Sequence, residues 1–278
     1  MILPDFILPS RINQQWEYSG IDSPEKCLDK LHFARYPHKI TYNYNSRGFR
    51  DQEWPSDHEL QQAIWCIGDS FTVGVGNLLE HTWPYLLEQH TGQRTINVSM
   101  DGASNNWIAR KAFQVQRLLR PKYIVVQWSY LHRRELDFVT TMEKLWPIFY
   151  NQVRDPSWPE TAEFAQLSTK IQIELTVLHN WPGLISDEER MVQYLKTTVD
   201  EDIDDTIACI NYLGNDVIHT FIPNFIDTNN QNKFYAQLDQ TGIVYIKDFK
   251  RLDLARDGHH YDIKTSEFFI QQILQVLN

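Results

Sequence analysis

Ser70, His260 and Asp257 have the residue types and the spacing that covalent catalysis by a serine requires. Ser70 ends a Gly-Asp-Ser run at 68–70, which follows a short apolar segment at 64–67. Asp257 and His260 stand three residues apart, so both side chains can face one way on a single turn. Together the three would supply a hydroxyl nucleophile, an imidazole base and a carboxylate that orients the imidazole. We therefore expect Ser70 to attack an acyl carbonyl.

Each of these residues also has a simpler interpretation. A serine after a strand can merely cap the next helix, and the Gly-Asp-Ser run alone favours that reading. His259 is the rival base, but it lies only two residues from Asp257 and is interpreted as a surface histidine. Asp257, His259, His260 and Asp262 could form a metal site, although no other group with ligand spacing supports one. We expect neither a metal ion nor an organic cofactor.

The chain resembles the SGNH hydrolases, also called the GDSL esterase/lipase family, in four segments that follow the family's order. They are Asn-Ser-Arg-Gly-Phe-Arg at 45–50, Gly-Asp-Ser at 68–70 with Gly74, the segment 97–105 around Gly102, and Asp-x-x-His at 257–260. The combination spans most of the chain and is more specific than any single motif. The resemblance implies a catalytic triad of Ser70, His260 and Asp257. It also implies an oxyanion hole that contains the backbone N–H groups of Ser70 and Gly102.

One family feature is missing. The third oxyanion donor of the family is an Asn in a Gly-x-Asn-Asp block after the third strand, whereas residues 128–133 read Trp-Ser-Tyr-Leu-His-Arg. Loss of one such donor costs ~3 kcal/mol in the transition state. The substitutes considered are Asn105, Tyr130, His132 and Arg133, with His132 preferred within its loop. Asn105 is equally well interpreted as a residue at the start of a helix.

Three functions remain open. The first is a serine ester hydrolase acting on a small O-acyl ester, such as an acetylated carbohydrate. The second is a thioesterase, lysophospholipase or acyltransferase of the same fold. The third is a non-catalytic binding protein, which the missing Asn favours and the intact Ser70, Asp257 and His260 disfavour.

The composition excludes several classes of protein. The chain has 278 residues, 42% of them hydrophobic, and a net charge of -10, which argues against binding to nucleic acid or anionic membranes. No apolar run reaches the length of about 18 residues that a membrane span needs. The first residues lack the basic and apolar regions of a secretory signal, and the three cysteines show neither a disulfide nor a zinc pattern. We expect a cytoplasmic protein with a small-molecule partner, and the oligomeric state stays open.

Alternating strand and helix patterns after residue 60 predict an α/β fold. Expected strands are 64–67, 94–98, 123–128, 217–222 and 243–246; expected helices start at 83 and cover 104–119, 187–213 (capped by Ser186) and 262–277. With the resemblance, this pattern predicts a three-layer α/β/α sandwich around a five-stranded, mostly parallel sheet, flavodoxin-like and of the SGNH hydrolase type.

The remaining segments interrupt this repeat. Residues 1–60 are broken by prolines and are expected to form an arm that packs on the core and rims the site. Residues 61–278 are expected to form a single hydrolase domain. Within it, residues 137–186, rich in Trp and Pro, are predicted to be an insertion over the carboxyl ends of the strands.

Overall fold

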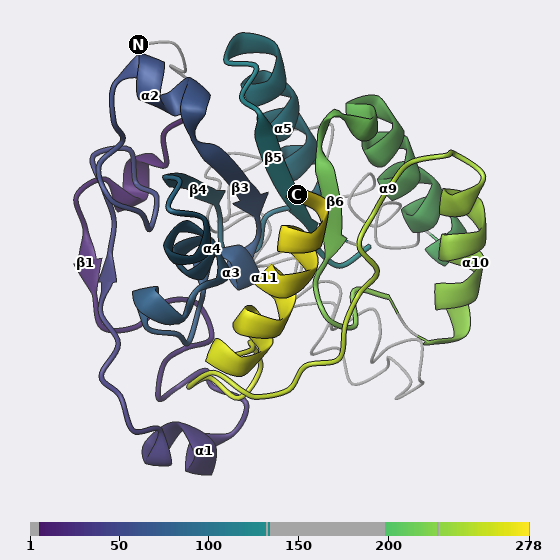
Figure 1. The fold of residues 1–278 in the computed structure, drawn as a ribbon. Helices are drawn as coiled ribbons and strands as arrows, with labels where there is room; N and C mark the ends of the chain where they lie inside the picture. Colours follow the sequence, from purple (N-terminus) through teal and green to yellow (C-terminus); the bar gives the residue numbers. More distant parts are fainter. Residues whose placement is uncertain (1–5, 132, 134–197, 227, 278) are drawn as a thin grey trace, which may run out of the picture.

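A four-stranded parallel sheet forms the centre of the protein, in the strand order β4-β3-β5-β6 (Figure 1). The computed structural model describes residues 6–131, 133, 198–226 and 228–277. The strands are β3 (Ile64–Gly68), β4 (Thr95–Ser99), β5 (Tyr123–Trp128) and β6 (Ile218–Phe221). Almost every residue in them is buried, which is why they read as continuous apolar runs rather than alternating patterns.

Two pairs of helices flank this sheet: α4 (Trp83–Thr91) packs with α11 (Ile263–Leu277), and α5 (Asn105–Leu118) packs with α9 (Val199–Leu213). The chain runs from β3 outward to β4, then back past β3 to β5 and β6. Because such crossovers are right-handed, the change of direction puts α4 and α5 on opposite faces of the sheet. The prediction of an α/β fold with a parallel sheet is confirmed. A further helix, α10 (Thr228–Asp239), contacts α9.

The predicted fifth strand is wrong for the part of the chain that the structure describes. Residues 243–246 run beside β6 but form only one bridge, between His219 and Tyr245. The backbone N–H of Val244 donates at 2.8 Å to the side-chain oxygen of Asn215. A side-chain amide therefore replaces the strand carbonyl that would have extended the ladder.

The helix boundaries follow local capping groups. The Ser104 hydroxyl accepts a hydrogen bond from the N–H of Trp107, which starts α5 where the sequence predicts it. Helix α9 instead begins at Val199, because Thr198 has extended backbone and forms a capping box with Glu201. The prediction of one continuous helix over 187–213 is therefore wrong at Thr198, and residues 187–197 lie outside the described residues. Ser186 and the predicted insertion at 137–186 lie outside the described residues.

Large aromatic side chains fill the core. Trp65, Trp83, Trp107 and Trp128 are among the largest fully buried side chains and join one hydrophobic cluster with the sheet and its helices. Phe6, from the N-terminal segment, lies in the same cluster and contacts Trp65 edge to face. Within the described part of the chain, none of the helices combines the length and the hydrophobicity that crossing a bilayer requires.

Short elements make up the chain before β3. They are the 3-10 helix Pro9–Arg11, β1 (Gln15–Trp16), α1 (Lys30–Arg35), β2 (Tyr42–Asn43) and α2 (Asp57–Gln62). The strands β1 and β2 pair antiparallel as a separate ribbon and do not extend the central sheet. Two further 3-10 helices, Leu79–His81 and Gly214–Asp216, lie in later connections.

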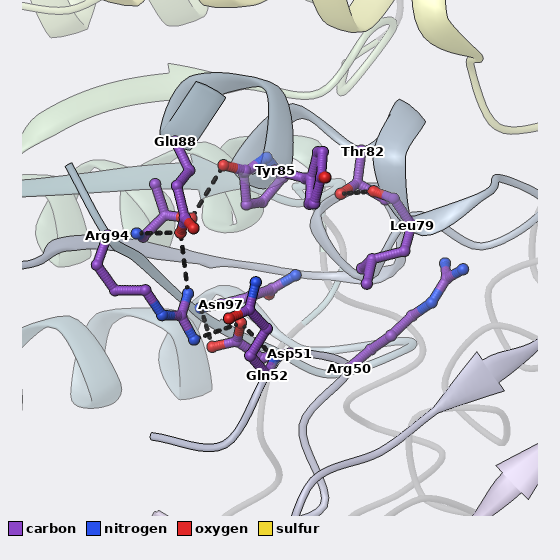
Figure 2. Close-up of a pocket in the computed structure, with 11 residues that line it drawn as sticks. Arg50, Asp51, Gln52, Leu79, Thr82, Tyr85, Glu88, Arg94 and Asn97 are labelled. Atoms are coloured by element: carbon purple, nitrogen blue, oxygen red, sulfur yellow. Dashed lines mark hydrogen bonds and ion pairs between the residues drawn. The ribbon is translucent and has the colours of Figure 1, made fainter. Parts of the chain in front are cut away.

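Charged side chains fasten this N-terminal segment to the edge strand β4. Asp51 accepts hydrogen bonds from Arg94 at 2.8 Å and from the backbone N–H of Asn97 at 3.1 Å (Figure 2). Glu88 of α4 accepts from the same guanidinium group at 3.1 Å. Burial raises the pKa of Asp51 to about 6, against the opposing effect of Arg94. The carboxylate of Asp51 thus covers part of an edge that would otherwise expose backbone groups.

Candidate active site

Ser70 lies directly after β3, at the carboxyl end of the sheet. Gly68 ends the strand, and a Cβ atom there would lie 2.1 Å from the Thr72 hydroxyl, so only glycine fits. Asp69 then caps the short helix α3 (Ser70–Val73), accepting a hydrogen bond from the N–H of Phe71 at 3.0 Å. The strand order reverses between β3 and β5, and open α/β sheets bind ligands at such a reversal.

The three predicted triad residues come together in one hydrogen-bonded line. Ser70 Oγ lies 2.8 Å from Nε2 of His260, and Nδ1 of His260 lies 2.5 Å from Oδ2 of Asp257. The other carboxylate oxygen of Asp257 accepts the backbone N–H groups of His259 and His260, at 2.8 and 2.9 Å. The turn at 257–260 thereby holds the carboxylate and the imidazole in a fixed relation. All three triad side chains are buried.

The electrostatics of this line assign the protons. Burial alone would raise the pKa of Asp257, but attraction to His260 and three hydrogen bonds, one from the imidazole and two from backbone N–H groups, outweigh burial and lower it. Burial likewise opposes a charged His260, yet the charge and hydrogen bond of Asp257 raise its pKa above the ordinary value. An ionised carboxylate can only accept, so Nδ1 of His260 carries a hydrogen. The lone pair of Nε2 is then directed at the Ser70 hydroxyl, which donates to it.

His259 does not compete for this position. Its Nε2 lies 3.2 Å from the hydroxyl of Tyr130, whereas Ser70 is bonded by His260. Burial, together with the neighbouring charge of His260, lowers the pKa of His259 to about 3, so the ring is neutral. The residue is half-buried, so its interpretation as a surface histidine is wrong.

The alternative metal cluster is not supported by these partners. Asp262, its fourth proposed member, accepts from the Tyr36 hydroxyl at 2.6 Å and lies 2.8 Å from His81. Among the described residues, no group of three His, Cys, Asp or Glu side chains is arranged to hold a metal ion.

A buried ion pair stands directly behind the nucleophile. Arg133 donates to Asp69 at 2.8 Å and to the Ser129 hydroxyl at 2.9 Å. Ser129 donates in turn to the same Asp69 oxygen at 2.6 Å. From the sequence, Arg133 was predicted only as a substitute oxyanion donor, and no role was predicted for Ser129. No local motif links 69 with 129 and 133; the pairing of β3 with β5 brings them together.

The candidate oxyanion donors lie in different surroundings. Gly68 pairs with Ser99, so the turns that carry Ser70 and Gly102 leave the sheet side by side. Gly102 has φ +75°, a conformation that favours glycine. The N–H of Ser70 belongs to the first turn of α3, where N–H groups have no carbonyl partner within the helix.

The side-chain amide of Asn105 is hydrogen-bonded to other residues of the protein. Its amide nitrogen donates to the Thr206 hydroxyl at 3.2 Å and to the carbonyl of Tyr130 at 3.3 Å, and its oxygen accepts from the N–H of Ser129 at 2.9 Å. These contacts favour its interpretation as a residue that fixes the start of α5. Tyr130 directs its hydroxyl at His259, and burial raises its pKa to about 12. His132 lies outside the described residues.

Comparison with known proteins adds no family assignment. No protein-family model matches the chain, and no curated protein is similar to it in sequence.

Proposed function

We propose that the protein is a serine ester hydrolase that cleaves a small O-acyl ester. The observation that carries this proposal is the line from Ser70 through His260 to Asp257, with contacts of 2.8 and 2.5 Å. A serine with a base within hydrogen-bond reach, and a third group that orients the base, is the signature of an activated nucleophile. The resemblance to SGNH hydrolases, and with it a three-layer, flavodoxin-like fold, supports the same assignment.

The reaction follows from the proton positions. Ser70 Oγ attacks the carbonyl carbon of the ester while its proton passes to Nε2 of His260. The tetrahedral intermediate collapses, and the leaving alcohol takes that proton from His260. Water then attacks the acyl-serine, giving its proton to His260, and the carboxylic acid departs as Ser70 regains a proton. Asp257 stays ionised and stabilises the imidazolium in both steps.

The oxyanion is stabilised in this scheme by the N–H groups of Ser70 and Gly102. Both residues follow neighbouring strands: Ser70 begins helix α3, and Gly102 lies shortly before helix α5. A third donor from Tyr130 or His132 would increase the rate by about 10² or more.

Two alternatives stay attached to the same site. Acyl transfer or thioester hydrolysis would use the same nucleophile and base, since the fold does not define the substrate. One observation favours a binding protein without turnover. Asn105, the asparagine nearest in the sequence to Gly102, uses its side-chain amide in hydrogen bonds to Thr206, Ser129 and Tyr130 rather than toward a substrate.

A substrate panel tests the proposal. We expect the protein to hydrolyse short-chain p-nitrophenyl esters or acetylated sugars, and we expect Asp257→Asn and Ser70→Ala variants to lose that activity. Turnover of thioesters alone would favour the second function. A protein that turns over none of these compounds would be a binding protein.

A further inference from the structure

The N-terminal segment reaches the loops that carry the candidate triad. Gly20 lies against Asp101, next to Gly102: a Cβ on Gly20 would meet the Asp101 carboxylate at 2.3 Å. The backbone at Gly258 lies against Asp29, whose Cβ atom would be 3.2 Å from an added Cβ. His32 lies 2.8 Å from the carbonyl of Ala255. Residues 20–32 therefore border the site loops on two sides.

Four residues of this region form a closed ring of hydrogen bonds. The N–H of Arg256 donates to the carbonyl of Gly76 at 3.0 Å. The Arg256 guanidinium donates twice to Asp22, at 2.8 and 2.6 Å. Asp22 accepts from the Tyr42 hydroxyl at 2.5 Å, and that hydroxyl accepts the N–H of Gly76 at 2.7 Å, which closes the ring.

The ring touches the triad at Asp257. This residue follows Arg256 directly in the chain, and Gly76 packs against its carboxyl group. A Cβ on Gly76 would lie 3.1 Å from the carboxyl carbon of Asp257, and Gly76 has φ +79°. The side chains of Asp22, Tyr42 and Arg256 are all buried, so water does not replace these bonds.

A second arginine also holds this loop. Arg50, also buried, donates to the carbonyl oxygens of Val73, Gly74 and Asn77, and it stacks over the ring of Tyr42 at 4.3 Å. In Figure 2 its guanidinium group points away from Asp51 and Arg94, which form the separate cluster at β4. The loop from α3 to Gly76 is thus attached to the N-terminal segment at several points.

We infer that Asp22 and Tyr42 are positioning residues, which hold the carboxylate of Asp257 in line with His260 through Arg256 and Gly76. The inference rests on the proposed function, because it assigns these residues a purpose in that reaction. A bidentate arginine–carboxylate pair fixes direction as well as distance. The hydroxyl of Tyr42 then links that pair to the backbone that borders Asp257.

Tyr42→Phe tests the inference, with Tyr44→Phe as its matched control. Tyr44 is buried directly after strand β2, and its hydroxyl contacts Ser19 outside the ring at 3.3 Å. We expect Tyr42→Phe to lower kcat by ~10-fold or more with little change in KM, because displacement of a catalytic group by ~1 Å costs up to ~10²-fold. Tyr44→Phe should keep the wild-type kcat. Arg256→Lys, which keeps the charge and loses the two-pronged contact, replaces Tyr42→Phe if that variant does not fold.

The titration of His260, followed by NMR with labelled histidine, separates positioning from simple destabilisation. In the wild type, Asp257 faces His260 directly, and His259, Asp69 and Asp101 lie around it. We expect Tyr42→Phe to shift the titration of His260 toward lower pH, and Tyr44→Phe to leave it unchanged. Equal kcat and equal titration in the two variants would overturn the inference. A wild type without turnover would overturn the proposed function instead, and the His260 titration would still test the ring.

Discussion

Arg133 donates a hydrogen bond to Asp69, the residue directly before the candidate nucleophile, at 2.8 Å. The carboxylate of Asp69 is fully buried and the guanidinium group nearly so. Removing one member of such a pair leaves the other charge buried without its partner, which costs far more than the pair contributes when intact.

We therefore expect Arg133→Met to lower the free energy of unfolding by about 3 kcal/mol. Ser129 and the N–H of Phe71 would still bond Asp69, so the loss falls at the lower end for buried pairs. Urea denaturation measures it. Arg117→Met, on the exposed side of α5, is the control and should be almost neutral. Equal losses for the two variants would mean that the pair does not stabilise the fold.

The pH dependence of the reaction should reflect the raised pKa of His260. His260 acts as a base only when it is neutral, so the rate rises as pH passes upward through its pKa. Because Asp257 raises that pKa above the ordinary value, we expect the midpoint of kcat/KM against pH above about 6.5. A midpoint at or below 6.5 would contradict the geometry of the pair.

A second histidine should control stability rather than rate. His219 is fully buried between Trp128 and the carbonyl of Gly214, and burial lowers its pKa to about 4. Between pH 6.5 and 4 the unfolded chain binds a proton at this site and the folded chain does not, so acid favours unfolding. When the pH falls from 7 to 4.5, the free energy of unfolding should decrease in both proteins. We expect the decrease to be roughly 2 kcal/mol smaller for His219→Gln than for the wild type.

The measurement is urea denaturation of both proteins at the two pH values. The comparison cancels groups that the proteins share, such as Asp51, whose raised pKa acts in the opposite direction. Parallel pH curves for the two proteins would show that His219 does not titrate in this range.

Single substitutions at Asn105, Tyr130 and His132 should separate structural from oxyanion roles. Asn105→Ala removes the bonds to Ser129 and Thr206, so we expect lower stability, by ~1–3 kcal/mol, as its main effect. A full oxyanion donor would instead show a loss of about 10² in kcat at unchanged KM. Kinetics and denaturation of Asn105→Ala, Tyr130→Phe and His132→Ala distinguish the two. If all three keep normal kcat, the hole consists of the Ser70 and Gly102 N–H groups.

Local patterns predicted much of the fold, because buried parallel strands and amphipathic helices leave clear periodicities. The strand Tyr123–Trp128 and the helix after Ser104 are where the sequence puts them. The prediction of a fifth strand failed because Asn215, almost thirty residues away in the chain, accepts the hydrogen bond from the N–H of Val244. A neighbouring strand would otherwise have accepted it. The prediction of an unbroken helix through Thr198 failed because that residue has extended backbone and forms a capping box with Glu201.

The candidate site was predictable only where its residues form local motifs. Asp257 and His260 share one turn, and Ser70 follows a strand, so spacing and strand position identified them. The partners of Asp69 and Arg256 had no such signal. Arg256 bonds Asp22 from 234 positions along the chain, and only the folded N-terminal segment brings the two together.

The most direct test of the central claim is covalent labelling with a fluorophosphonate probe, followed by mass spectrometry of the labelled peptide. If His260 activates Ser70, the probe should attach to Ser70 and to no other serine, and the Ser70→Ala variant should remain unlabelled at an unchanged Tm. Labelling of another residue, or a folded wild type that the probe does not modify, would contradict the account.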